Sequence, residues 1–340
     1  MLPCRGHPPS TMNISSIFNA WPGMYLAQSF LHSLIAALIV DTALLAWKIE
    51  APVIRQRFRL LVIILPIISF PLYQTITPER GSALFRLDAY FDIDRWLDLE
   101  LWGTVPVGVL FLLFLAFTAV VFILQELLPI AQHTLSSGNE ALEGVHPEPE
   151  SRVTRALEGL PGRTPEVFII DDDAFAMFSS TGKDPAVYLS GGLVEKLTLD
   201  ELRAAIAHEI GHIQRSRRPA MVMIFILRVL MFYNPIILME FRRIVQEEEK
   251  ICDDVAASLT GNRAALAGAL RKFYDADDEK QEPSREGAPR LRERIVNYSH
   301  TLLIEERITR LEEPSVPAAN TGVVYGIVLV TILAVNYYVV

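Results

Sequence analysis

Four long apolar stretches constrain the fold of this chain more than any other feature of its sequence. They cover residues 24–47, 58–77, 104–130 and 321–340. A helix needs roughly 20 residues to cross a hydrocarbon core of about 30 Å, so each stretch has about the length of a transmembrane helix. With 51% hydrophobic and 21% charged residues, the chain is too apolar for an ordinary soluble enzyme of 340 residues. We predict a mostly α-helical membrane protein with four transmembrane helices and a soluble part.

We expect that the N-terminal segment is retained and not cleaved as a signal peptide. The first apolar stretch is too long for the core of a signal peptide, and no small-residue cleavage site follows it. We therefore expect residues 1–23 to form an N-terminal tail outside the cytoplasm. Met12 is an alternative start, because residues 1–11 are rich in proline and show no periodicity.

Charges in two short connections predict how the helices are oriented. The first connection carries a cluster of basic residues, namely Lys48, Arg55, Arg57 and Arg59. The second connection, 78–103, has six acidic residues against three arginines. Because basic loops stay in the cytoplasm, we place the first connection inside and the second outside. Residues 24–130 then hold three spans, residues 131–320 are cytoplasmic, and 321–340 cross back, which leaves both termini outside a bacterial-type cytoplasmic membrane.

A fifth apolar run, 219–240, has the length of a span but contains Arg228 and an Asn234-Pro235 break. A full crossing would move residues 241–320 to the outside. A re-entrant or kinked amphipathic hairpin against the membrane keeps both flanks in the cytoplasm, so we favour the hairpin.

The cytoplasmic part is predicted to be an α+β domain. A short amphipathic helix is expected around residues 151–160, and three strands are expected at 166–170, 174–180 and 186–190, forming a small antiparallel sheet. The net charge is −9 and no broad cationic surface is present, which argues against a nucleic-acid partner. Membrane lipid is the expected surrounding of the spans.

The sequence HEIGH, residues 208–212, lies inside a predicted helix. Thr198 and Glu201 form a capping box ahead of an apolar-periodic run. Residues four apart share one face of a helix, so His208 and His212 can bind one zinc ion, with Glu209 beside them. Two solvated histidines on a surface helix are the alternative.

A catalytic zinc site needs a third protein ligand, and the acidic segment 246–259 is the best source. Of its three adjacent glutamates, only Glu249 has a carboxylate four residues later, Asp253. Glu249 can then bind the metal while Asp253 accepts the N–H of a ligating histidine. A solvated acidic helix start is the alternative. We leave Cys252 out of the ligand set, because such a cysteine is more often a small buried residue.

These segments together resemble a known family. AVYLSGGLVEKLTLDELRAAIAHEIGHIQR, then FYNPIILMEFRR after an apolar run, then EKICDDVAASL, are similar to the BlaR/MecR antirepressor family of membrane-embedded zinc metallopeptidases. That family pairs HExxH with an asparagine-proline in the apolar hairpin and with Glu-x-x-Cys-Asp. A more distant likeness is to the heat-shock and prenyl-protein-processing membrane proteases, which share HExxH and Glu-x-x-x-Asp.

The resemblance implies a zincin-like metalloprotease of the gluzincin type, with one zinc ion per chain. It implies the ligands His208, His212 and Glu249, a catalytic Glu209 and a supporting Asp253. Beta-lactam receptors of the family continue into a penicillin-binding sensor after the final span, whereas this chain stops at Val340, so we expect no such receptor.

A second departure concerns the late part of the domain. The related proteases have a His-Pro before an Arg-Ile pair, whereas His300 is followed by Thr301 here. For Arg307 we therefore favour a surface or structural position over a role in the site.

We expect hydrolysis of peptide bonds in a protein substrate, in signalling or regulated proteolysis, with Glu209 as base and acid. The substrate could be a cytoplasmic regulator or the chain itself. A homodimer of this chain is one expected arrangement of the protein. An edge strand could pair with an extended substrate; it would use Ala174, Phe175, Ala176 and Met177. Packing of the sheet is the equal alternative for this strand.

A different class of function is a non-proteolytic membrane receptor or scaffold with a structural metal site. It requires four ligands, for example with Cys252 added, and no role for Glu209. A glutamate beside the first histidine has no use in such a site, so the sequence favours the protease.

Overall fold

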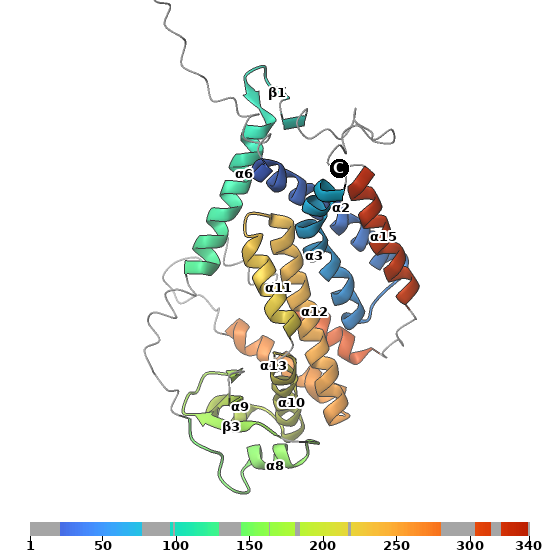
Figure 1. Cartoon of the computed structure of the whole chain (residues 1–340). Coiled ribbons are helices and arrows are strands. Elements are labelled where there is room, and N and C mark those ends of the chain that lie inside the picture. Colours follow the sequence, from blue (N-terminus) through green and yellow to red (C-terminus); the bar gives the residue numbers. More distant parts are fainter. Residues whose placement is uncertain are drawn as a thin grey trace, which may run out of the picture.

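Apolar helices gather at one end of the molecule, and a small sheet with further helices lies at the other end (Figure 1). The computed structural model describes residues 21–76, 96–97, 99–128, 144–162, 164–180, 184–216, 219–279, 303–313 and 321–338. Most of the predicted N-terminal tail and of the loop 78–103 lies outside the described residues. A short hairpin remains from that loop, formed by β1 (Glu100–Leu101) and β2 (Val105–Pro106).

Three helices are long and apolar enough to cross a membrane by length and composition. They are α2 (Trp21–Ala46), α3 (Pro52–Ile76) and α6 (Val107–Phe122), which continues into the π-helical turn η2 (Ile123–Leu127). A fourth apolar helix, α15 (Gly322–Tyr338), is shorter, with 17 residues. All four predicted apolar stretches therefore form helices. Among the described residues, three of these helices reach the length of a span.

The connection between α2 and α3 lies at the end of the bundle that faces the sheet. Arg55, near the start of α3, donates a hydrogen bond from Nε to Oε1 of Glu247 at 2.8 Å. Helix α15 begins at the same end, where the rings of Phe58 and Tyr325 lie 5.2 Å apart. The bundle thus presents the α2–α3 connection and the start of α15 to the same side as the sheet region.

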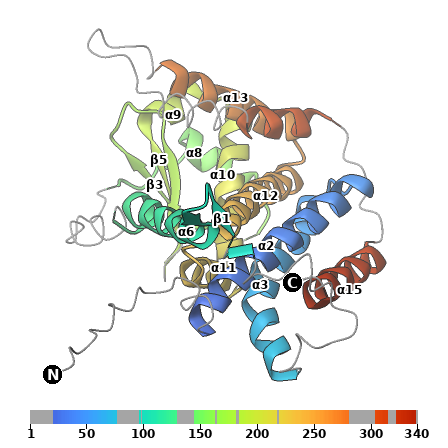
Figure 2. The same cartoon turned by 90° about the horizontal axis from the view of Figure 1, so that it is seen from above.

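Helices α11 (Pro219–Leu230) and α12 (Pro235–Thr260) form a hairpin whose turn is buried inside the bundle. At the turn, Asn234 donates from Nδ2 to Oγ of Ser33 on α2 at 2.9 Å. Ser33 lies more than three helical turns before the end of α2, about 20 Å along its axis. The hairpin therefore enters deeply between the apolar helices, and both of its arms lead back toward the sheet (Figures 1 and 2).

The sheet differs from the prediction in its topology. Its strands are β3 (Glu166–Ile170), β4 (Met177–Ser180) and β5 (Ala186–Ser190), in the order β3-β5-β4. β5 pairs antiparallel with β4 but parallel with β3, so the expected antiparallel sheet was wrong for one of its two pairings. The physical reason is burial. β5 is almost entirely buried and takes the centre, where neighbours cover both of its edges. It therefore lies beside β3, which runs in the same direction, as well as beside β4, which runs in the opposite direction.

Helices enclose the sheet on one face. They are α8 (Arg152–Glu158), α9 (Gly191–Lys196), α10 (Leu199–Ser216), α13 (Arg263–Glu279) and a helix over 303–312. α8 confirms the short helix expected there. Leu189, Leu193, Leu202 and Ile206 are fully buried in the core of this region. Each such side chain contributes about 1.5–3 kcal/mol relative to an exposed position.

Helix α12 belongs to both regions of the molecule. Ile237 and Ile244, in its first half, are buried against α3 and α6 in the bundle. Ala256, near its end, belongs to the core under the sheet. A rigid helix that shares two cores fixes the position of one region relative to the other.

Candidate metal centre

Local sequence determines where α10 begins, and so where the HEIGH residues lie. Thr198 Oγ1 accepts the N–H of Glu201 at 3.3 Å, and Glu201 Oε2 accepts the N–H of Thr198 at 2.7 Å. This is the capping box expected from the sequence. HEIGH then falls in the second half of an 18-residue helix.

The limits of α12 follow from local chemistry in the same way. Asn234 caps its start by accepting the N–H of Ile236 at 3.1 Å, and Pro235 occupies the first turn, where no backbone donor is needed. Gly261 ends the helix with φ of 64°, a left-handed conformation that favours glycine. The asparagine-proline break thus starts the helix that carries the remaining candidate ligands.

Helices α10 and α12 approach closely beside HEIGH. A Cβ placed on Gly211 would lie 3.4 Å from the Cα, Cβ and O atoms of Cys252. A glycine at this position lets the two backbones come almost into contact. The close approach brings side chains of α12 within reach of the two histidines.

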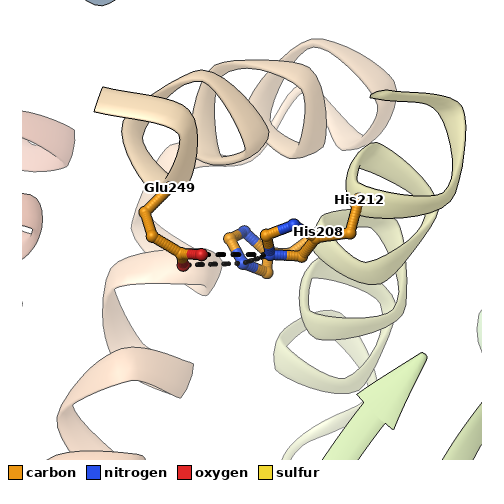
Figure 3. A group of neighbouring side chains, drawn as sticks. All are labelled: His208, His212 and Glu249. Atoms are coloured by element: carbon orange, nitrogen blue, oxygen red, sulfur yellow. Dashed lines mark hydrogen bonds and ion pairs between the residues drawn. The ribbon is translucent and has the colours of Figure 1, made fainter. Parts of the chain in front are cut away.

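Three side chains from these helices converge on one point (Figure 3). The Nε2 atoms of His208 and His212 lie 3.1 Å apart. The Glu249 carboxylate lies 3.5 Å from Nε2 of His208 and 3.4 Å from Nε2 of His212. Two imidazoles on one helix and a carboxylate on another therefore meet, as the spacing in the sequence predicted they could.

The spacing of these atoms fits a tetrahedral metal ion. Zinc bonds of about 2.0–2.1 Å at tetrahedral angles place two ligand atoms about 3.3 Å apart. The separations of 3.1, 3.4 and 3.5 Å lie close to that value. Two histidines and one glutamate also leave a fourth position open, as in hydrolytic zinc sites. His208, His212 and Glu249 could thus hold one zinc ion.

Asp253 and Arg307 support this group from behind. Asp253 Oδ1 lies 3.1 Å from Nδ1 of His208, the ring nitrogen that faces away from Glu249. Arg307 donates two hydrogen bonds to Asp253, at 2.7 and 2.8 Å, and its Nη1 lies 3.1 Å from Glu249. The sequence favoured a surface or structural position for Arg307, but its side chain is only 13% exposed and contacts two acidic residues of the centre.

The charges of the cluster are strongly coupled. Burial by itself lowers the pKa of His208, but Asp253 and Glu249 outweigh burial and raise that pKa to about 9. Burial alone raises the pKa of Glu249, yet His208 and Arg307 reverse the effect and lower it to about 2. The pKa of Asp253 is also lowered, because Arg307 and His208 outweigh its burial. The carboxylates thus stay charged and favour a cation between the two histidines.

Cys252 does not join the three converging atoms. Its Sγ lies 3.5 Å from Nδ1 of His212, on the side of the ring that faces away from Glu249. Burial and the neighbouring Glu248 and Glu249 raise the pKa of the thiol, so it stays neutral. A closed site with Cys252 as fourth ligand does not match this arrangement.

A cleft of about 620 Å³ opens beside the centre. His208, Glu209 and Glu249 line one part of it, and Phe175 and Met177 line another. Glu209 therefore faces the same space as His208 and Glu249. Of the residues proposed for a substrate strand, Phe175 and Met177 reach this cleft directly.

Strand β4 lies at an edge of the sheet, next to the cleft. Ser190 N donates to Ala176 O at 3.0 Å, so the backbone of Ala176 faces β5. Backbone groups alternate along an antiparallel strand, which turns those of Met177, the next residue, away from β5. The predicted strand was longer than the observed one: Ala174, Phe175 and Ala176 precede β4, and Met177 is its first residue.

Sequence comparisons relate this part of the chain to known peptidases. Residues 176–273, which begin just before β4 and end within α13, match the family described as BlaR1 peptidase M56. A "Protease HtpX homolog" of Bacteroides fragilis is 29% identical over 211 residues, which cover 48% of this chain and 65% of that protein. A "Protease HtpX homolog" of Tropheryma whipplei is 46% identical over 59 residues, covering 16% of this chain and 19% of that protein.

These similarities agree with the geometry of the centre. The peptidase match contains both histidines, Glu209, Glu249 and Asp253. The chain spans less than two thirds of the length of the Bacteroides relative. Together with three helices of membrane-spanning length, the matches support a membrane-associated protease of the metallopeptidase type.

Proposed function

We propose that this chain is a zinc-dependent endopeptidase that cleaves a protein or peptide substrate at the surface of a membrane. The observation that carries the proposal is the meeting of His208, His212 and Glu249 at 3.1–3.5 Å beside a cleft that Glu209 also lines. One zinc ion per chain matches the number and spacing of these atoms. The similarity of residues 176–273 to a peptidase family supports the same conclusion.

The residues of the centre have separate tasks in hydrolysis. A zinc ion would polarise the scissile carbonyl and make a water molecule more acidic. Glu209 takes a proton from the attacking water and passes it to the leaving amine. Asp253 holds His208 through Nδ1 and so keeps Nε2 free to bind metal. Arg307 balances the negative charge of Asp253 and Glu249.

An extended substrate strand fits the edge of the sheet. The backbone groups of Met177 face away from β5, and both Phe175 and Met177 line the cleft beside Glu209. A substrate segment that adds to this edge would be aligned by backbone hydrogen bonds, with little demand on its own sequence. Ala174 and Ala176 complete the proposed binding segment.

We place the catalytic region on the cytoplasmic side of a bacterial-type inner membrane, in a multi-pass protein with both termini outside. The basic α2–α3 connection supports this orientation, because it lies on the same side as the centre. In this arrangement α11 and the first half of α12 form a re-entrant hairpin. A substrate in signalling or regulated proteolysis would then be a cytoplasmic regulator or the chain itself. We also propose that the chain forms a homodimer and that lipid surrounds its spans.

Substitution Glu209→Gln tests the proposal most directly. The variant keeps the ligand set, so it should bind Zn²⁺ with unchanged affinity in a competition with a chromogenic chelator. Cleavage should fall by 10²–10⁴-fold, which is the usual contribution of a positioned general base. Cleaved proteins are identified by comparing the proteomes of cells that express the wild type or the variant.

Glu195→Gln is a matched control, because Glu195 is an exposed glutamate on the neighbouring helix α9. This control should cleave the same proteins as the wild type. Undiminished metal-dependent proteolysis by Glu209→Gln would contradict the proposal and leave the receptor or scaffold with a structural metal site.

A further inference from the structure

Three helices meet at a polar contact next to the metal centre. Arg215 of α10 forms a two-pronged ion pair with Glu248 of α12; its Nη2 lies 2.7 Å from Oε2, and its Nε also bonds Oε1. Gln56, from the first turns of α3, bonds both partners. Its Nε2 donates to Glu248 at 2.7 Å, and its Oε1 accepts from Arg215 Nη2 at 3.4 Å.

Each member of the ion pair lies next to a candidate ligand. Arg215 follows His212 by three residues, less than one turn of α10, and Glu248 directly precedes Glu249. A helix moves as a rigid unit over such short distances. Any shift of Arg215 relative to Glu248 therefore changes the separation of the His212 and Glu249 ligand atoms.

Burial makes this contact strong and well defined. The side chains of Arg215 and Glu248 are each only 9% exposed. A buried pair of this kind needs all of its hydrogen bonds to be satisfied, and the Gln56 amide supplies both a donor and an acceptor.

Neighbouring contacts of α3 lack this connection to α10. Arg55 bonds Glu247 at 2.8 Å, and Arg59 bonds Glu240 at 2.8 Å, and both acceptors lie on α12. Gln56 is therefore distinct from its neighbours, because it joins α3 to both helices that carry candidate ligands.

We propose that Gln56 is a positioning residue that makes the metal geometry depend on the place of α3 in the bundle. By holding Arg215 and Glu248 in register, it sets the distance between His212 and Glu249. α3 is one of the candidate membrane spans, so a displacement of this span would alter the affinity of the centre for its metal. This inference rests on the proposed function.

Full-length protein in detergent micelles provides the test, with Zn²⁺ as the probe. Gln56→Met keeps the size of the side chain but removes both hydrogen bonds. We expect Zn²⁺ affinity, measured against a chromogenic chelator, to fall about 10–100-fold, as is usual when a residue that supports ligands is lost. Turnover should fall while KM stays nearly constant. Gln56→Lys, which can still donate to Glu248 but offers no acceptor to Arg215, should change the affinity in the same direction.

Arg55→Met is the matched control. It removes the adjacent contact between α3 and α12 without touching α10, and should lower the thermal midpoint while Zn²⁺ affinity changes less than about threefold. Equal losses of affinity in Gln56→Met and Arg55→Met, or no loss in Gln56→Met, would overturn this inference and leave the proposed function intact. Absence of Zn²⁺ binding by the wild-type protein would instead overturn the proposed function, and this inference with it.

Discussion

The two halves of α12 use the same residue type for different purposes. In the first half, Glu240 is almost fully buried between Arg59 of α3 and Arg243 of its own helix, at 2.8 and 2.6 Å. In the second half, Glu249 is 32% exposed, faces a cleft and lies 3.4–3.5 Å from two imidazoles. One glutamate connects apolar helices, and the other is available to a cation from solution.

The difference shows that the neighbouring groups determine the role of each carboxylate. Each oxygen of Glu240 contacts a guanidinium, which is always charged, whereas at Glu249 Arg307 contacts Oε2 alone and Oε1 faces His212. A neutral imidazole has a lone pair of its own and so shares a cation with a neighbouring carboxylate. Four substitutions test this difference between the two carboxylates.

Glu249→Gln should have the largest effect. This effect should be confined to Zn²⁺ binding and to the proteolysis that depends on it. Replacing the carboxylate by an amide removes the anionic ligand, so Zn²⁺ affinity and proteolysis should each fall by about three orders of magnitude or more. The fold should persist, because Glu249 is partly exposed and its neighbour Asp253 still pairs with Arg307. Chelator competition and far-UV circular dichroism measure the two quantities. Retention of tight Zn²⁺ binding would mean that Glu249 is no ligand.

Glu240→Gln should have the opposite profile. It leaves Arg59, whose side chain is 6% exposed, with a weaker partner in the interior of the bundle. Removing one member of a buried ion pair lowers the free energy of unfolding by about 3–5 kcal/mol. Denaturant titration in micelles would detect the loss, while Zn²⁺ affinity should stay within a factor of about three of the wild type. A large loss of affinity with unchanged stability would remove the distinction between the two halves.

Local patterns in the sequence predicted much of this molecule. Strands 166–170 and 186–190 were predicted to the residue, because apolar runs between turn signals mark them. The capping box and the asparagine-proline break fixed where α10 and α12 begin. Spacing of four residues on one helix also brought His208 and His212 together. All of these features depend on neighbours within a few residues.

Several features that depend on distant partners were not predicted. The parallel pairing of β3 with β5 depends on which strand is most deeply buried, and short apolar strands do not reveal this. Arg307 contacts Asp253 across 54 residues of sequence, and Gln56 contacts Glu248 across 192. Asp41 likewise pairs with Arg59 and Arg243, across 18 and 202 residues.

Asp253→Asn should have an intermediate effect, since Asp253 supports a ligand without belonging to the three converging atoms. The amide oxygen can still lie beside Nδ1 of His208, but the amide no longer neutralises Arg307. Changes behind a metal ligand commonly cost 10–100-fold in affinity or activity. Zn²⁺ affinity should therefore fall less than in Glu249→Gln. A loss as large as that of Glu249→Gln would place Asp253 among the ligands.

Glu201→Gln should have the smallest effect, because the partner of Glu201 on α13, Lys272, is 37% exposed, and Glu201 does not face the histidines. Burial alone raises its pKa, but Lys272 and Thr198 outweigh burial and hold the pKa below the ordinary value of 4.5. A lowered pKa in the folded state means that the charged form adds stability above pH 4.5, and that this part is lost as the pH falls through the folded pKa.

At pH 7 the variant should therefore lose about 1 kcal/mol, the usual contribution of a helix cap. The difference from the wild type should shrink steadily below pH 4.5, which denaturant titrations from pH 7 to 3 would show. A difference that stays constant over this range would assign the loss to shape rather than to charge. Because Glu201 is on the helix that carries both histidines, unchanged Zn²⁺ affinity in this variant would also show that its carboxylate has no part in metal binding.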